Sequence, residues 1–153
     1  MTLLLVFFIG FFAGFRSLTA PAATAWAVYL GWLKIDRPLA LIGSLYSVAI
    51  FSVLAIVELL ADKLPQTPSR TAPPGLIARI VMGGLTGACV AASGAQSIVL
   101  GVTVGAIGAV IGCFAGYQAR TRLVKTLNVQ DLYIALIEDL VAIGGSLWVV
   151  SRF

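Results

Sequence analysis

Apolar residues occupy long runs of this chain, and the polar residues between them divide it into five candidate membrane elements. A helix needs about 20 mostly apolar residues to cross the hydrocarbon layer of a bilayer. Runs of about this length or longer occupy residues 3–33, 38–62, 76–92, 98–118 and 132–150. The later runs are separated by the loop DKLPQTPSRTAPPG, by the weak break SGAQS and by the basic stretch ARTRLVKTLNVQD. Because proline disrupts a helix, the four prolines of the first loop exclude a helix through it.

The run at residues 3–33 is too long for one crossing and too short for two full crossings. The segment SLTAP lies in its middle, and Pro21 disfavours helical geometry at Ala20. We therefore expect a broken element, with one helix to about Arg16, an unwound turn, and a second helix through AATAWAVYLGWL. The alternative is a single long, tilted helix with a proline kink.

The composition supports a membrane location for these runs. Of the 153 residues, 60% are hydrophobic and 10% are charged, and the mean hydropathy is +1.05. Soluble domains carry about 25% charged residues, so this chain lacks the polar surface that water requires. The sequence predicts an all-α fold, a polytopic transmembrane helix bundle of about five membrane elements with residues 1–153 as a single domain. The lipid bilayer is its expected partner.

The basic residues predict an orientation for the bundle. The formal net charge is +4, but the ten Lys and Arg residues form no basic stripe, so we expect no nucleic-acid partner. With five crossings, six basic residues face one side and three face the other, and the richer side is expected to be cytoplasmic. This places the N-terminus inside and the C-terminus outside. The richer side carries Lys63, Arg70, Arg79, Arg120, Arg122 and Lys125, and the other side carries Lys34, Arg37 and Arg152.

Histidine is absent, which removes the commonest metal ligand and the commonest general base. Cys89 and Cys113 lie inside apolar runs and form no C-x-x-C pair, so we interpret them as packing residues. We therefore expect neither a cofactor nor a metal site.

Glycines recur at three- and four-residue spacing in the third and fourth runs, which places them on one face of each helix. In lipid, helices associate by close backbone contact at such faces, so we expect helix packing and self-association into a homo-oligomer. A glycine-lined pore would need the same residues. The glycines are Gly83, Gly87, Gly101, Gly105, Gly108, Gly112 and Gly116.

Two pairs of short segments are alike. GFFAGF at residues 10–15 resembles GCFAGY at 112–117, and AIVELLAD at 55–62 resembles ALIEDLVA at 135–142. Five crossings would place the two units in opposite orientations, which is the inverted-repeat arrangement of many transporters. An inverted repeat is therefore one hypothesis, and chance similarity between apolar segments is the other.

Ionisable residues inside membrane spans are costly, so those in this chain are candidate site residues. Arg16 is the clearest case. Beside an unwound turn it would be satisfied by Glu58, by Glu138, or by an anion bound at the start of the second helix. Interfacial anchoring is the simpler interpretation of several others, including Asp62, Lys63 and Arg79. The full set of candidates is Arg16, Ser17, Thr19, Glu58, Asp62, Lys63, Arg70, Arg79, Arg120, Glu138 and Asp139.

Three motifs carry a resemblance to a known family. They are ELLADKLPQTPSRTAP, the following ARIVMGGLTGA, and the late ALIEDLVAI. Together they resemble a bacterial integral-membrane family catalogued as domain of unknown function 4126. The matching residues are Glu58, Asp62, Lys63, Pro65, Glu138 and Asp139. The resemblance implies a location in the bacterial cytoplasmic (inner) membrane. It implies no particular activity.

Three functions remain open on this evidence. The leading hypothesis is a small transporter or channel that moves a polar or anionic solute past Arg16 and the acidic residues. A structural or accessory membrane subunit would need only the packed glycine faces. A membrane enzyme acting on a lipid phosphate would need Mg²⁺ at Glu138 and Asp139, and is favoured least because catalytic motifs are absent.

Overall fold

The computed structural model describes residues 1–62, 71–127 and 130–153, which form six α-helices, one short 3-10 helix and no strand. The helices are α1 (Thr2–Phe15), α2 (Thr19–Tyr29), α3 (Leu45–Ala61), α4 (Pro73–Ser93), α5 (Ile98–Leu127) and α6 (Asp131–Val150), with the 3-10 helix η1 (Leu39–Gly43) before α3. The predicted all-α bundle is confirmed. Two candidate residues, Lys63 and Arg70, lie outside the described residues.

The surface of the bundle is apolar over its length. Helices α4, α5 and α6 are each long and apolar enough to cross a membrane, and α1 and α3 are shorter apolar helices. On α3 the exposed side chains include Ile50, Val53, Leu54, Ile56, Val57 and Leu60. A continuous apolar face of this kind is suited to lipid and not to water. The chain is therefore an integral membrane protein.

The first element is broken where the sequence predicts. Helix α1 ends at Phe15, Arg16 has extended backbone geometry (φ −138°, ψ 116°), and α2 begins at Thr19. Pro21 lies in the first turn of α2, where its missing N–H interrupts no helical hydrogen bond. Helix α2 ends before Gly31, whose φ of +77° is a conformation that glycine adopts without a steric penalty.

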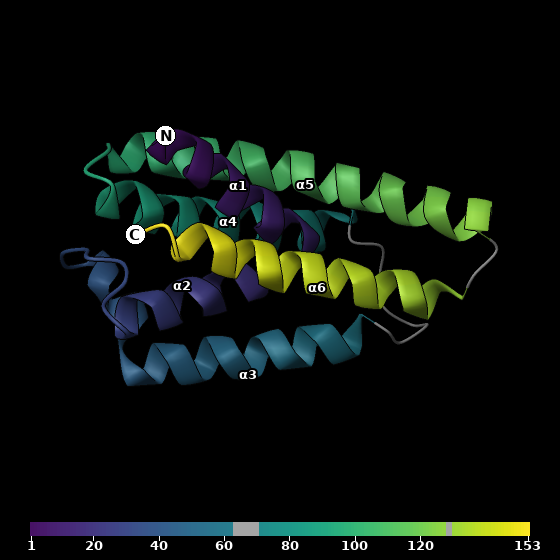
Figure 1. Cartoon of the computed structure of the whole chain (residues 1–153), viewed down its shortest axis with the longest axis horizontal. Helices are drawn as coiled ribbons and strands as arrows, with labels where there is room; N and C mark the ends of the chain where they lie inside the picture. The colour runs from purple at the N-terminus through teal and green to yellow at the C-terminus, as the bar shows by residue number, and fades with distance from the viewer. Residues whose placement is uncertain (63–70, 128–129) are drawn as a thin grey trace.

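The broken element is a hairpin, because α2 turns back toward the end of the bundle where α1 begins (Figure 1). Leu5 and Val6 of α1 share a buried cluster with Leu33 beyond α2 and with Val149 and Val150 at the end of α6. The two chain termini therefore lie at the same end of the bundle, here called the terminal end, and the turn at Arg16 lies toward the opposite end. The expectation of termini on opposite sides is wrong, because the first element returns instead of crossing once.

Close backbone contact between α1, α4 and α5 forms the tightest packing in the bundle. A Cβ atom added at Gly112 would lie 2.0 Å from the carbonyl oxygen of Phe11, and one at Gly105 would lie 2.3 Å from that of Gly83. Real side chains do not approach a backbone so closely, so these positions require glycine. A Cβ atom would also meet backbone atoms within 3.0 Å at Gly83, Gly87, Gly101 and Gly108, whereas at Gly116 it would meet the side chains of Phe15 and Glu138. The glycine face of α5 therefore packs against α1 and α4 of the same chain.

Helices α1 and α5 run in the same direction. Phe7 contacts Gly108, Phe11 contacts Gly112, and Phe15 contacts Gly116, so residue numbers rise together along the two helices. The similar segments at 10–15 and 112–117 are therefore parallel neighbours. An inverted repeat requires opposite directions, and this pair gives that hypothesis no support.

The hairpin predicts on which side of the membrane each end of the chain lies. Reporters fused before Thr2 and after Phe153 should give the same compartment, because both termini lie at the terminal end. A reporter placed after Leu127 should give the other compartment. The basic residues lie mostly at the Arg16 end, so we expect the termini outside and Leu127 in the cytoplasm. Opposite compartments for the two termini would show that the first element crosses the membrane once.

Candidate functional site

Arg16 lies at the centre of the turn between α1 and α2, with none of its surface exposed. Its Nε donates a hydrogen bond of 2.7 Å to Oδ1 of Asp139, and its Nη2 lies 2.6 Å from the same oxygen. Its Nη1 forms an ion pair with Asp62. Asp62 directly follows α3 and Asp139 lies in α6. One guanidinium group therefore connects the hairpin turn to two other helices.

The partners of Arg16 differ from those the sequence suggested. The sequence suggests Glu58, Glu138 or a bound anion as the partner of Arg16, whereas Asp62 and Asp139 pair with it. Asp62 is one helical turn beyond Glu58, and Asp139 is the neighbour of Glu138. Asp62 is also not the solvated interfacial anchor that seemed the simpler interpretation.

Glu58 caps the start of α2 from the neighbouring helix α3. Its carboxylate accepts hydrogen bonds of 2.8 Å from the backbone N–H groups of Ser17 and Leu18, and one of 2.5 Å from the hydroxyl of Ser17. A negative charge is stabilised at a helix N-terminus, because the free N–H groups and the helix dipole point toward it. The sequence suggested that these amides would receive a bound anion. In the structure an internal carboxylate occupies that position.

Arg79 of α4 is buried, with 4% of its surface exposed. Its Nε donates a hydrogen bond of 3.1 Å to the carbonyl oxygen of Gly14, and its Nη1 donates one of 2.9 Å to that of Gly75. The last turn of a helix leaves carbonyl groups without helical partners, so Arg79 satisfies one near the end of α1. It is not the exposed anchor that the sequence favoured.

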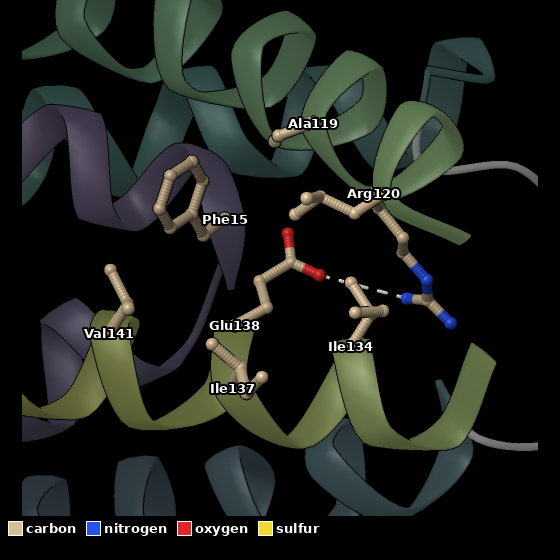
Figure 2. A pocket seen from close by; sticks show the side chains of 9 residues that line it. Phe15, Ala119, Arg120, Ile134, Ile137, Glu138 and Val141 are labelled. Carbon is tan, nitrogen blue, oxygen red and sulfur yellow. Dashed lines mark ion pairs between the residues drawn. The ribbon is translucent and has the colours of Figure 1, made fainter. Parts of the chain in front are cut away.

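The side chain of Glu138 points toward α5 and Arg120 (Figure 2). Its Oε2 lies 3.7 Å from Nη1 of Arg120, and Arg120 also makes two hydrogen bonds to Asp131 at the start of α6, one of 2.7 Å from Nε. Asp131 was not a candidate from the sequence, although an acidic residue just after a basic stretch is a signal that could have suggested the pair. Glu138 therefore has Arg120 among its partners, and Asp139 has Arg16 among its partners.

We refer to the residues joined in this region as the charge cluster. Among the described residues it contains three guanidinium groups and five carboxylates, a formal excess of two negative charges. Its members are Arg16, Glu58, Asp62, Arg79, Arg120, Asp131, Glu138 and Asp139. Across residues 1–62, 71–127 and 130–153, no three Asp, Glu, Cys or His side chains are grouped so as to hold a metal ion.

The charge cluster lies near one face of the hydrocarbon layer. Gly116, which contacts Phe15, is about 27 Å along α5 from Ile98, at ~1.5 Å per residue. The layer is about 30 Å thick. Tyr117 and Tyr133 are exposed near the cluster, and Trp32, Tyr46 and Trp148 are exposed toward the terminal end, as expected for residues at the two membrane interfaces.

Two candidate hydroxyl positions lie on α2 and α6, which contact each other. Thr19 of α2 is 6% exposed and Ser146 of α6 is fully buried. Neither side-chain oxygen has a hydrogen-bond partner among the described residues. Ser146 was missed by the sequence analysis, because a single serine in an apolar helix is common and gives no signal of its own.

The fold and the site define an α-helical integral membrane protein in which a helical hairpin is held by a buried charge cluster. The family model described as Domain of unknown function (DUF4126) matches residues 3–151, and the chain belongs to this family. No curated protein and no solved structure matches the chain.

Proposed function

We propose that this protein is a transporter or channel for a small polar solute, and that the solute is a cation or a proton rather than an anion. The proposal rests on the hairpin of α1 and α2. The turn between these helices has irregular backbone and is held by buried ionic groups. Irregular backbone and buried charge are costly in a membrane and occur mainly where they line a path or a binding site. Discontinuous helices of this kind form the solute sites of many transporters.

The preference for a cation or a proton follows from the partners of the basic groups. Arg16 is already held by Asp62 and Asp139, and the backbone N–H groups of Ser17 and Leu18, just before α2, are already held by Glu58. An anion would have to displace these carboxylates. The charge cluster also has the excess of two negative charges, which favours a positive solute. The buried hydroxyls of Thr19 and Ser146 supply further polar positions inside the bundle.

The alternatives receive less support. A lipid phosphatase that binds Mg²⁺ between Glu138 and Asp139 receives no specific support, since Asp139 pairs with Arg16 and Glu138 lies 3.7 Å from Arg120. An accessory subunit would be consistent with the glycine packing and would need the charge cluster only to hold the hairpin in place, but it has no need for the excess of negative charge in the cluster. Homo-oligomer formation stays a prediction, and the glycine face of α5 no longer argues for it, because that face is used within the chain.

Flux into proteoliposomes tests the proposal. We expect the wild-type protein to carry potassium, sodium or protons faster than empty vesicles do, and to carry chloride and phosphate no faster. The isosteric substitution Asp139→Asn should reduce the flux at least tenfold, because it removes a carboxylate while Asp62 still pairs with Arg16. Thermal melting of the same variant checks its folding.

Asp36→Asn is the matched control, since it makes the same change at an exposed position beyond α2. Its flux should equal that of the wild-type protein. Flux of anions alone would overturn the preference for positive solutes. Flux no greater than that of empty vesicles, for every ion in the panel, would overturn transport and favour the accessory role.

A further inference from the structure

Two buried hydroxyl groups on neighbouring helices are left without a hydrogen bond. Thr19 begins α2, Ser146 lies in α6, and these two helices pack against each other. The side-chain oxygen of each makes no hydrogen bond with any described residue, and neither oxygen has surface that a water molecule could reach. Buried polar groups in proteins are almost always hydrogen-bonded, so each exception needs a physical explanation.

Other buried hydroxyls of this bundle do have partners. Thr24 of α2 and Thr86 of α4 have no exposed surface, and each donates a hydrogen bond of 2.9 Å to the carbonyl oxygen four residues earlier in its own helix. Thr19 has no such carbonyl within α2, because it is the first residue of that helix and the backbone of Arg16 before it is extended. The two unsatisfied hydroxyls are therefore a feature of the closed contact between α2 and α6.

The two hydroxyls continue the polar region of the charge cluster toward the middle of the bundle. Thr19 follows Arg16 by three residues, and α2 and α6 both run from this level toward the terminal end (Figure 1). Ser146 follows Asp139 by seven residues, which is two helical turns or about 10.5 Å along α6. Residues seven apart share one face of a helix, and Ala142 between these two is small and fully buried. Because Asp139 faces the hairpin through Arg16, Ser146 faces it too.

An apolar layer closes this polar row at the terminal end. Ser146 is followed by Val149 and Val150, which are fully buried and share a cluster with Leu5 and Val6 of α1. Apolar constrictions close membrane paths by excluding water. The pocket between α5 and α6 has an almost entirely apolar surface (Figure 2), so it suits neither water nor an ion.

We propose that the solute passes between α2 and α6, and that these helices separate to admit water, with the hydroxyls of Thr19 and Ser146 lining the path. In the closed state both hydroxyls lack hydrogen bonds. In the open state water supplies them, which offsets part of the cost of separating the helices. Hydroxyl groups both donate and accept hydrogen bonds, so the same path suits a hydrated cation or a proton moving along water. This inference rests on the proposed function, for which it names the path and two lining residues.

Cysteine accessibility tests whether the contact between α2 and α6 opens. In proteoliposomes, Ser146→Cys should react with 2-aminoethyl methanethiosulfonate at least tenfold faster than Thr86→Cys. Thr86 is the matched control, because it is equally buried but its hydroxyl already has a partner within α4. The wild-type protein, in which Cys89 and Cys113 are buried, gives the background rate. Melting checks the folding of both variants, and equal rates in folded protein would overturn the proposed opening.

Removal of the hydroxyl separates a lining role from ordinary packing. Ser146→Ala should raise the melting temperature by a few degrees, because the closed state loses an unsatisfied buried group. The same variant should lower cation or proton flux at least fivefold, because the open path loses a polar contact. Thr86→Val removes a bonded hydroxyl and should give neither the rise in melting temperature nor the loss of flux. A Ser146→Ala protein that melts below the wild-type protein, or that carries ions at the wild-type rate, would contradict the lining role.

Failure of this inference is distinguishable from failure of the proposed function. Ion flux in wild-type vesicles, with an unreactive Ser146→Cys and unchanged flux in Ser146→Ala, would leave transport standing and remove the α2–α6 contact as the path. A reactive Ser146→Cys with no flux of any ion would show that α2 and α6 separate, and would overturn transport.

Discussion

Arg16→Met should lower the free energy of unfolding by about 3–5 kcal/mol, which is the usual cost of breaking a buried ion pair by removing one partner. The substitution would remove the buried cation that pairs with both Asp62 and Asp139. Thermal unfolding in detergent measures the effect through the thiol reactivity of Cys89 and Cys113, which are both buried in the folded protein. A melting temperature well below that of the wild-type protein is expected.

Two further variants separate loss of charge balance from loss of packing. Adding Asp62→Asn and Asp139→Asn to Arg16→Met should recover part of the lost stability, because the amides carry no charge to leave unbalanced. Arg152→Met is the matched control, since Arg152 is exposed at the chain terminus and stacks on Trp148 with 4.9 Å to the ring centroid. If Arg16→Met and Arg152→Met melt alike, the charge of Arg16 contributes nothing to the fold.

Gly112→Ala should destabilise the bundle by about 1–3 kcal/mol or more, the usual range for overpacking a well-packed interior. The new methyl group would lie 2.0 Å from a backbone oxygen of Phe11, so α1 and α5 would have to move apart. The same melting measurement applies. Gly144→Ala in α6 is a matched control, because a Cβ atom there would meet nothing within 4 Å. Alanine also favours a helix over glycine, so this control should melt at the wild-type temperature or above it.

The double replacement of Gly108 and Gly112 by leucine should prevent folding altogether. Both added side chains would enter the backbone of α1, at Phe7 and Phe11. A folded but smaller particle in detergent would contradict this expectation, because it would mean that the glycine face of α5 holds separate chains together.

The helices and the break at Arg16 could be predicted because each depends on local sequence. Runs of apolar residues determine the spans, and Pro21 with its polar neighbours determines the break. The direction of α2, which folds back along α1, could not be predicted. A first element that crosses the membrane once and one that folds back as a hairpin have the same local pattern of apolar and polar residues. Their difference depends on whether Leu33 packs against residues near the N-terminus, which is a contact between distant segments.

The charged residues of the candidate site could be selected from the sequence, but their pairing could not. The acidic pairs Glu58 and Asp62, and Glu138 and Asp139, each offer two carboxylates within about one helical turn. A shift of α3 by about one turn along its axis, or a rotation of α6 by about 100°, would exchange which of the two carboxylates meets Arg16. The structure assigns the aspartates to Arg16 and leaves Glu58 for the backbone N–H groups of Ser17 and Leu18, just before α2. That choice is made by helix packing, which no local pattern encodes.

The pairing of Arg16 with Asp139 has a consequence for the biosynthesis of the protein. The two residues are separated by 123 positions, so Arg16 leaves the ribosome long before its second partner exists. Asp62, 46 positions later, arrives first and can offset the charge only in part. During most of translation the tip of the α1–α2 hairpin must therefore remain near interfacial water or within the insertion machinery. Insertion of α6, the last helix made, completes the neutralisation of Arg16, so a ribosome-bound chain that lacks α6 should keep this arginine accessible to guanidinium-reactive reagents.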